Sequence, residues 1–145
     1  MKRRNVLGLA LPALILAQTP STARAKKSLL IHLTQGPENP TRSALAFLVA
    51  RAAIEEGHTV SLFLAGDAVQ LMRDEVLDQL NGLGTGSLRE SFTAVVRGGG
   101  RFYLSTGSSK PRGITEAIIK DKSAEFATPA VLVRLTLSHD RALTY

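Results

Sequence analysis

Short apolar runs alternate with longer, largely apolar segments over most of the chain. Residues 28–34, 59–64 and 101–105 are apolar runs with the length of a buried strand, and polar or turn-forming residues follow each of them. Residues 124–127 and 141–145 predict two further, shorter strands. Since longer segments separate these runs, we expect strands and helices to alternate along the chain.

The segments between the strands carry the signals of helices. Asn39 is a suitable cap and Pro40 suits the first turn of a helix over residues 41–56, which Gly57 would end. Further helices are predicted over residues 68–80, 87–97, 111–120 and 129–138, and a loose loop over residues 81–86. Alternating strands and helices are typical of a mainly parallel sheet covered on both faces. The sequence therefore predicts a three-layer α/β/α domain with a mainly parallel five-stranded sheet, flavodoxin/Rossmann-like in type.

The helix expected over residues 41–56 is almost continuously apolar. Its only clearly polar residues are Arg42, Ser43, Arg51, Glu55 and Glu56. A helix that covers one face of a sheet needs an apolar stripe rather than an apolar surface all round. We therefore expect this helix to pack against another subunit as well. The alternative is that its alanines make the outer surface only mildly apolar.

The first 25 residues have the pattern of a cleavable signal peptide. Lys2, Arg3 and Arg4 precede an apolar run over residues 6–17, and Ala23-Arg24-Ala25 has the small-x-small pattern of a cleavage site. The run is too short for a transmembrane helix, which needs about 20 apolar residues. We expect export to the periplasm by the Sec route, or by the twin-arginine route that the Arg3-Arg4 pair also fits. Residues 26–145 then form a single domain.

Removal of this segment changes the charge of the protein. Four of the 18 basic residues and none of the 12 acidic residues lie within residues 1–25, so the formal net charge falls from +6 to +2. No basic cluster remains that favours nucleic acid, and no membrane association is expected after cleavage. The chain has no cysteine, so packing and self-assembly have to stabilise it without disulfides.

No pattern in the sequence predicts a metal or a cofactor. No three ligating residues occur at the spacing of a metal site. Gly82, Gly84 and Gly86 do not form a phosphate-binding loop, because no strand precedes them and no Gly-Lys-Ser/Thr follows. We therefore expect no cofactor.

A candidate ligand site follows from the expected sheet. Ligands bind open parallel sheets at the carboxyl ends of the strands, near the point where strand order reverses. The loops expected at this edge, with the first turns that follow them, contribute the candidate ligand-binding residues Gln35, Asn39, Arg42, Asp67, Ser105, Thr106, Ser108, Lys110 and Arg112. Backbone N–H groups at helix starts near Pro40 and Pro111 would favour a small anionic ligand. The same residues are also typical of loops and helix caps, so an inert rim is the alternative.

Four segments of the chain, in this order, resemble the DsrE/DsrF-like family. They are TQGPENPTRSA at residues 34–44, GHTVSLF at 57–63, SKPRGI at 109–114 and DRALTY at 140–145. The resemblance covers residues 28–145 and depends on the order and spacing of these motifs. It implies a compact α/β domain that assembles into dimers, trimers or hexamers. It also implies a sulfur relay, because active members carry sulfur as a persulfide on a cysteine in the loop after the third or fourth strand.

The position of that cysteine aligns with Ser105 in this chain. A hydroxyl has neither the acidity nor the sulfur chemistry on which persulfide transfer depends. As a hydrolytic nucleophile, Ser105 would need a base within hydrogen-bond reach. The histidines are His32, His58 and His139, and each would reach Ser105 only through a long-range contact. The sequence therefore predicts no catalytic residue.

These observations favour an exported, non-catalytic domain. It is expected to assemble with itself and to bind a small anionic ligand or a protein partner at the carboxyl edge of its sheet. One alternative is an accessory subunit of a sulfurtransferase-type relay that uses the thiol of a sulfur-relay partner protein. The other is a purely structural oligomer.

Overall fold

A computed structural model describes residues 24–145 of the chain. The signal peptide expected over residues 1–25 therefore lies, apart from its last two residues, outside the described residues. The elements, in chain order, are β1 (Ser28–Leu33), α1 (Pro40–Glu55), β2 (Thr59–Leu64), η1 (Gly66–Met72), α2 (Asp74–Gln79), β3 (Asn81–Gly82), β4 (Gly86–Ser87), α3 (Leu88–Arg97), β5 (Arg101–Ser105), α4 (Thr106–Ser109), η2 (Lys110–Arg112), α5 (Glu116–Ile119), β6 (Ala124–Ala127), α6 (Pro129–Ser138) and β7 (Arg141–Thr144).

Five strands form one sheet in the order β6-β5-β2-β1-β7, and all four pairings are parallel. The register places Ile31 beside Leu62, and Leu62 beside Phe102. Apolar side chains on one face of neighbouring strands therefore form continuous rows. The predicted five-stranded parallel sheet of an α/β domain is confirmed.

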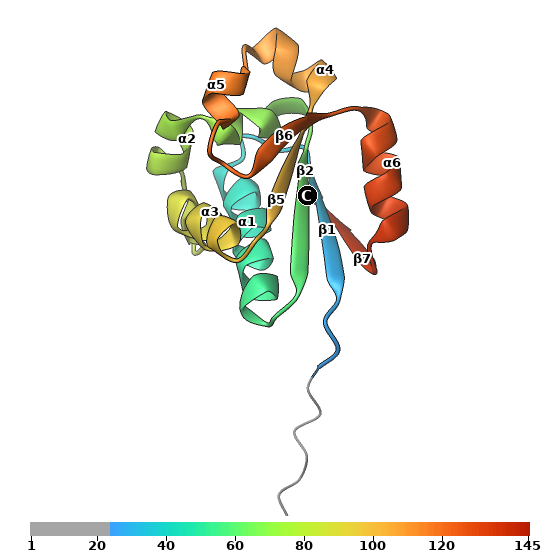
Figure 1. Cartoon of the computed structure of the whole chain (residues 1–145). Coiled ribbons are helices and arrows are strands. Elements are labelled where there is room, and N and C mark those ends of the chain that lie inside the picture. Colours follow the sequence, from blue (N-terminus) through green and yellow to red (C-terminus); the bar gives the residue numbers. More distant parts are fainter. Residues whose placement is uncertain (1–23) are drawn as a thin grey trace, which may run out of the picture.

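The order of the strands explains how the helices divide between the two faces. From β1 through β2 and β5 to β6, each crossover moves one strand further in the same direction. Right-handed crossovers then place α1 and α3 on the same face. The last crossover returns from β6 to β7 on the far side of β1, so α6 lies on the opposite face. Figure 1 shows α1, α2 and α3 on one side of the sheet and α6 on the other.

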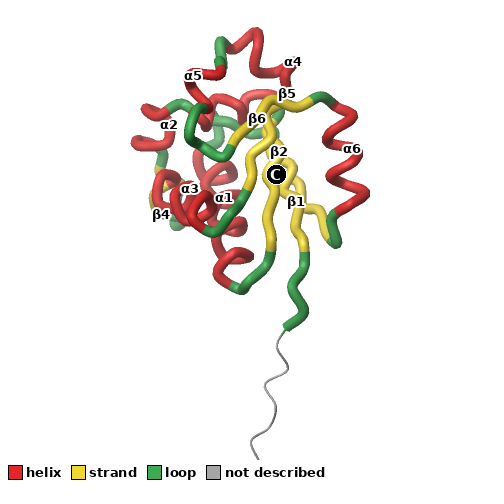
Figure 2. Tube along the Cα trace, in the orientation of Figure 1, coloured by secondary structure: helices red, strands yellow, loops and turns green. Residues whose placement is uncertain are grey.

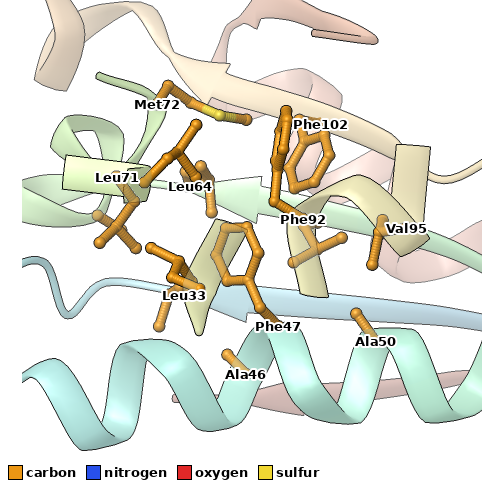
Figure 3. Packing of buried hydrophobic residues seen from close by; sticks show 14 of the residues in the cluster. Leu33, Ala46, Phe47, Ala50, Leu64, Leu71, Met72, Phe92, Val95 and Phe102 are labelled. Carbon is orange, nitrogen blue, oxygen red and sulfur yellow. The ribbon is translucent and has the colours of Figure 1, made fainter. Parts of the chain in front are cut away.

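The main core lies between the sheet and α1, α2 and α3. Phe47 of α1 stacks on Phe102 of β5 with ring centroids 5.6 Å apart, and Phe92 of α3 lies 5.3 Å from Phe102. Figure 3 shows these rings together with Leu33, Leu64 and other buried aliphatic side chains. A smaller cluster around Leu30 and Phe63 lies under α6 on the other face. The sheet is thus buried unequally, more deeply on the α1 side.

The apolar surface of α1 has two neighbours within the chain. One flank packs on the sheet and another packs on α3 and on β3. Near its end, Ile54 lies so close to Gly98 that a side chain on that glycine would collide with it. Contacts within the chain therefore account for much of the apolar character of this helix, and its packing against another subunit stays a prediction. Leu45 of α1 is nevertheless 38% exposed, and Val133 and Leu137 of α6 are more exposed, at 56% and 81%.

The region between β2 and α3 differs from the sequence-based expectation. The single helix expected over residues 68–80 is divided into η1 and α2, because Arg73 has an extended backbone between them. Residues 81–86 belong to a small antiparallel hairpin rather than to a loose loop. Gly84 and Gly86 have positive φ angles, and the N–H of Leu83 donates to Thr41 Oγ1 of α1 at 3.0 Å. The hairpin is therefore fastened to the start of α1.

The prediction of one helix over residues 111–120 is wrong. Two short elements, η2 and α5, lie in this range, and α4 precedes them; Figure 2 shows these turns beyond the end of β5. Gly113 has a left-handed backbone with φ of 63°, and Thr115 is extended, so a continuous helix cannot pass through them. Pro111 consequently lies inside a 3-10 turn and does not begin a long helix. Within residues 24–145, no helix combines the length and apolar character needed to span a membrane.

Candidate functional site

The loops after β1 and β2 touch one another at the carboxyl edge of the sheet. A side chain on Gly36 would collide with the backbone carbonyl of Asp67, so glycine is required for this approach. The hydroxyl of Ser43 in α1 donates to the carbonyl of Gly36 at 2.7 Å and to that of Gln35 at 3.0 Å. The first loop is thereby tied to both α1 and the second loop.

Three of the predicted site residues belong to this first loop and the start of α1. Asn39 Oδ1 accepts a hydrogen bond from the backbone N–H of Arg42 at 3.3 Å, which makes Asn39 the cap of the helix. Gln35 takes part through its backbone carbonyl. The side chain of Arg42 is exposed, and within the described residues it forms neither a hydrogen bond nor an ion pair. Asn39 is therefore structural, whereas Arg42 is available to solvent.

A chain of hydrogen bonds joins the loops after β2 and β5. The backbone N–H of Gly66 donates to Ser108 Oγ at 2.8 Å, and the Ser108 hydroxyl in turn donates to Ser105 Oγ at 3.2 Å. Ser105 Oγ also accepts from the backbone N–H of Ser108 at 3.3 Å, which caps α4. Both predicted serines are thus occupied by contacts that hold the two loops together.

An ion pair lies beside these serines. Arg112 Nε donates to Asp67 Oδ1 at 2.9 Å, and Arg112 Nη1 donates to the carbonyl of Ser108 at 3.2 Å. Both ionic side chains are partly exposed, so we expect the pair itself to contribute little to stability. Arg73, which the sequence analysis missed, donates from Nη2 to the carbonyl of Arg112 at 2.7 Å. No local sequence signal indicates this contact, because 39 residues separate the partners.

The remaining predicted residues, Thr106 and Lys110, lie on the loop that follows β5. Thr106 Oγ1 donates to the carbonyl of Ala127 at the end of β6, at 3.2 Å. Lys110 is exposed, and its ammonium has no hydrogen-bond or ion-pair partner among residues 24–145. The structure therefore joins Asp67, Ser105, Ser108 and Arg112 in one network. It leaves Lys110 and Arg42 as cations outside that network.

No histidine is hydrogen-bonded to Ser105 in the described part of the chain. His58 and His139 lie at the amino edge of the sheet, where His139 Nε2 is 3.1 Å from Ser61 Oγ. His32 is on β1, two strands from Ser105 on β5, a separation of about 10 Å between the strands. Partial burial lowers the pKa of His32 below its usual value. Ser105 therefore has no histidine base that would activate it as a nucleophile.

The described residues also contain no cluster of three His, Cys, Asp or Glu side chains placed to hold a metal ion. The rim consists of hydroxyls, one internal ion pair and two solvent-exposed cations. Such a set of groups is able to bind through hydrogen bonds and positive charge. It has no thiol with which to carry sulfur, since the sequence contains no cysteine.

Known proteins share this architecture. The structure is similar to that of the YchN protein from E. coli, with a TM-score of 0.67 and 23% identity over 83% of this chain and 99% of that one. It is also similar to BT1422, a conserved protein of unknown function from Bacteroides thetaiotaomicron, with a TM-score of 0.56 and 13% identity over 82% of this chain and 95% of that one. No curated protein matches the sequence significantly. The model of the DsrE/DsrF-like family matches residues 27–145, and this chain therefore belongs to the DsrE/DsrF-like family.

Proposed function

We propose that this protein is an exported, non-catalytic member of its family that assembles with itself. In this proposal the rim at the carboxyl edge of the sheet binds a small anion or a protein partner. The observation that carries the non-catalytic assignment is the state of Ser105. Its oxygen accepts hydrogen bonds from the N–H and the hydroxyl of Ser108, and the chain contains no cysteine.

A sulfur-loading assay tests the non-catalytic assignment. The protein is incubated with a low-molecular-weight persulfide, and protein-bound sulfane sulfur is measured after desalting. We expect no retained sulfur in the wild type and retention in Ser105→Cys, because only a thiolate sulfur forms the persulfide. The assignment would be refuted if the wild type turned over the persulfide and Ser105→Ala abolished this activity. A Ser108→Cys variant, which has its thiol elsewhere on the same loop, is the matched control for the position of the cysteine.

Anion binding is supported by the two cations outside the internal network. Arg112 is paired with Asp67, whereas Lys110 and Arg42 have no partner among residues 24–145. We therefore assign the anion to Lys110 and Arg42 rather than to Arg112. A calorimetric titration with inorganic phosphate should give an affinity at least severalfold lower in the double variant Arg42→Ala/Lys110→Ala than in the wild type. Lys120→Ala is the control, and equal affinity in all three proteins would contradict this assignment.

Self-assembly is supported by the surface formed by α6 and β7. Val133 and Leu137 are 56% and 81% exposed on α6, and Leu143 is 39% exposed on β7, the edge strand of the sheet. An edge strand has unpaired backbone groups that another strand can pair with. We therefore assign the subunit contact to α6 and β7, because Val133 and Leu137 are more exposed than Leu45, which is 38% exposed on α1.

Native mass spectrometry of the protein isolated from the periplasm tests this contact. The wild type is expected to be a homo-oligomer and Leu137→Glu a smaller species. Leu83 is 90% exposed at the tip of the hairpin, so Leu83→Glu is a matched control that should leave assembly unchanged. A wild-type monomer, or an oligomer that only Leu83→Glu disrupts, would overturn the assignment. The same sample tests export, because the cleaved protein should begin at Lys26.

Membership of the family also supports a second candidate function, an accessory subunit in a sulfur relay. The protein has no thiol, so a partner protein would have to provide the sulfur-carrying cysteine. Co-purification of a cysteine-containing protein that depends on Lys110 and Arg42 would favour this role. Purification of the protein alone, with phosphate affinity retained, would favour the primary proposal.

A further inference from the structure

A hollow lies on the α1 side of the sheet, between the start of α1, the helix α2 and the hairpin of β3 and β4. It has a volume of about 300 Å³, which is at the lower end of the range of small-molecule sites. Its apolar wall consists of Pro37, Pro40, Val76 and Leu80, and the last two also pack in the main core. The hydrogen bond from the hairpin to Thr41 holds the start of α1 in place. The wall is therefore formed before any ligand binds.

Three side chains form the polar part of the hollow, namely Glu75, Gln79 and Asn81. The carboxylate of Glu75 is exposed, and among residues 24–145 it has neither a hydrogen-bond nor an ion-pair partner. Asn81 donates from Nδ2 to the backbone carbonyl of Gln79 at 3.3 Å, and its Oδ1 accepts no hydrogen bond in the described part of the chain. The hollow thus offers oxygen acceptors, one of them charged, to a hydrogen-bond donor.

The charges around α2 favour a positively charged ligand. Arg89 donates to Asp74 at 3.0 Å and to Asp78 at 2.7 Å, and Lys122 forms an ion pair with Asp74 at 3.1 Å. These two cations balance the two aspartates, so the charge of Glu75 is left without a counterion within residues 24–145. No lysine, arginine or histidine lines the hollow. The local field therefore attracts a cation and repels an anion.

We propose that this hollow binds a free organic ammonium ion with a compact apolar body about the size of a benzene ring. The body packs on the wall that Pro40 and Val76 help to form, and the ammonium donates to the carboxylate of Glu75. An ammonium has only donors, which suits a site whose charged group has only acceptors. The proposal goes beyond the anion site at the rim, because its ligand has the opposite charge. Neither Arg42 nor Lys110 lines this hollow.

The ligand needs both its charge and its apolar body. Because Glu75 is exposed, an ion pair with it contributes little free energy of binding by itself. Burial of apolar surface on the preformed wall contributes more. A bare ammonium leaves the wall uncovered, and a neutral apolar molecule leaves the carboxylate unused. Discrimination between these compounds is therefore the property to measure.

The test is a calorimetric titration with benzylammonium, in which amide chemical shifts also map the site. Methylammonium supplies the charge without the body, and benzyl alcohol supplies the body without the charge. We expect benzylammonium to bind at least about tenfold more tightly than methylammonium, because its ring covers the apolar wall. It should bind at least about threefold more tightly than benzyl alcohol, which is the contribution of an exposed ion pair. The largest shifts should lie within residues 75–81.

Glu75→Gln keeps the shape of the hollow and removes its charge. This variant should bind benzylammonium at least about threefold more weakly and benzyl alcohol as tightly as the wild type does. Glu116→Gln is the matched control, because Glu116 is also an exposed acidic residue in the first turn of a short helix and does not line the hollow. Val76→Phe places a larger side chain in the hollow and should abolish the binding of both aromatic compounds.

Three results would overturn the proposal, whether or not Val76→Phe folds. The first is unchanged benzylammonium affinity in Glu75→Gln. The second is an equal loss of affinity in Glu75→Gln and Glu116→Gln, since the overall charge of the protein would then explain the effect. The third comes from the amide of Nα-acetyl-lysine, which has the same ammonium on a narrow stem. If this compound binds as tightly as benzylammonium, the hollow is a site for a lysine side chain of another protein and not for a free amine.

Phosphate distinguishes this inference from the proposed rim site. Phosphate binding without benzylammonium binding overturns the ammonium site and leaves the rim proposal standing. Benzylammonium binding without phosphate binding supports the ammonium site and contradicts the rim proposal. Absence of both overturns both.

Discussion

Replacement of the buried lysine Lys122 by methionine should destabilise the domain strongly. Lys122 is 8% exposed, and its ammonium donates to the carbonyl of Met72 at 2.8 Å and to that of Ile118 at 2.6 Å. It also forms an ion pair with Asp74 at 3.1 Å. One side chain thereby joins the turn before β6, the end of η1 and the start of α2. Methionine keeps the length of the apolar stem and removes every donor.

The magnitude follows from the groups left without a partner. Two hydrogen bonds from a charged donor contribute about 3–6 kcal/mol together. Loss of the buried charge relieves a desolvation penalty of a few kcal/mol, which offsets part of this sum. We therefore expect Lys122→Met to lower the free energy of unfolding by about 2–3 kcal/mol. With a urea slope of about 2 kcal/mol/M, the midpoint of unfolding should fall by about 1–1.5 M.

Urea unfolding followed by far-ultraviolet circular dichroism measures this change. Lys120→Met is the matched control, because Lys120 is exposed two residues earlier and should change stability by no more than about 0.5 kcal/mol. A Lys122→Met protein as stable as the wild type would refute the reasoning. It would mean that the desolvation of the ammonium cancels its three contacts in the folded state.

Three further predictions concern the core, the rim and the response to acid. Phe47→Ala should lower the free energy of unfolding by about 3–5 kcal/mol, because the ring is fully buried against Phe102; a loss below 1 kcal/mol in urea unfolding would contradict the packing. Gly36→Ala should destabilise by about 1–3 kcal/mol through its collision with Asp67, whereas Gly107→Ala, which has open space, should not. Hydrogen bonds from Arg89 and then Lys122 lower the pKa of Asp74, so their stabilisation is present above its ordinary value of 3.8 and is lost as pH falls through the folded value. Asp74→Asn should therefore lose less stability than the wild type on acidification below pH 3.8, and an identical pH profile would count against this pairing.

Local sequence signals predicted most of the candidate site by position but little of its chemistry. Ser105, Ser108 and Arg112 were expected at the carboxyl edge, and the structure places them there. Their actual roles depend on partners far along the chain, since 45 residues separate Arg112 from Asp67 and 42 separate Ser108 from Gly66. No spacing rule links such residues, because the sheet alone brings their loops together. Ser109 has the same residue type as Ser108, yet only packing decides that its hydroxyl is buried and unpaired.

The sequence by itself determined the alternation of strands and helices, and with it the parallel α/β sheet. Strand length, the cap at Asn39 and the proline at the start of α1 act over a few residues, so they are readable without a structure. The absence of cysteine, and hence of any thiol chemistry, is equally a property of the sequence.

Tertiary structure alone decided which surfaces meet. The apolar residues of α1 predict burial but do not distinguish α3 of the same chain from a second subunit, because burial of apolar area has no direction. The helix expected over residues 111–120 is interrupted because Gly113 is left-handed, because Thr115 is extended, and because the N–H of Ile114 donates to the carbonyl of Ser109. Local helix propensity is a weak influence that packing overrides. Here the loops at the sheet edge determined the backbone conformation of residues 111–120.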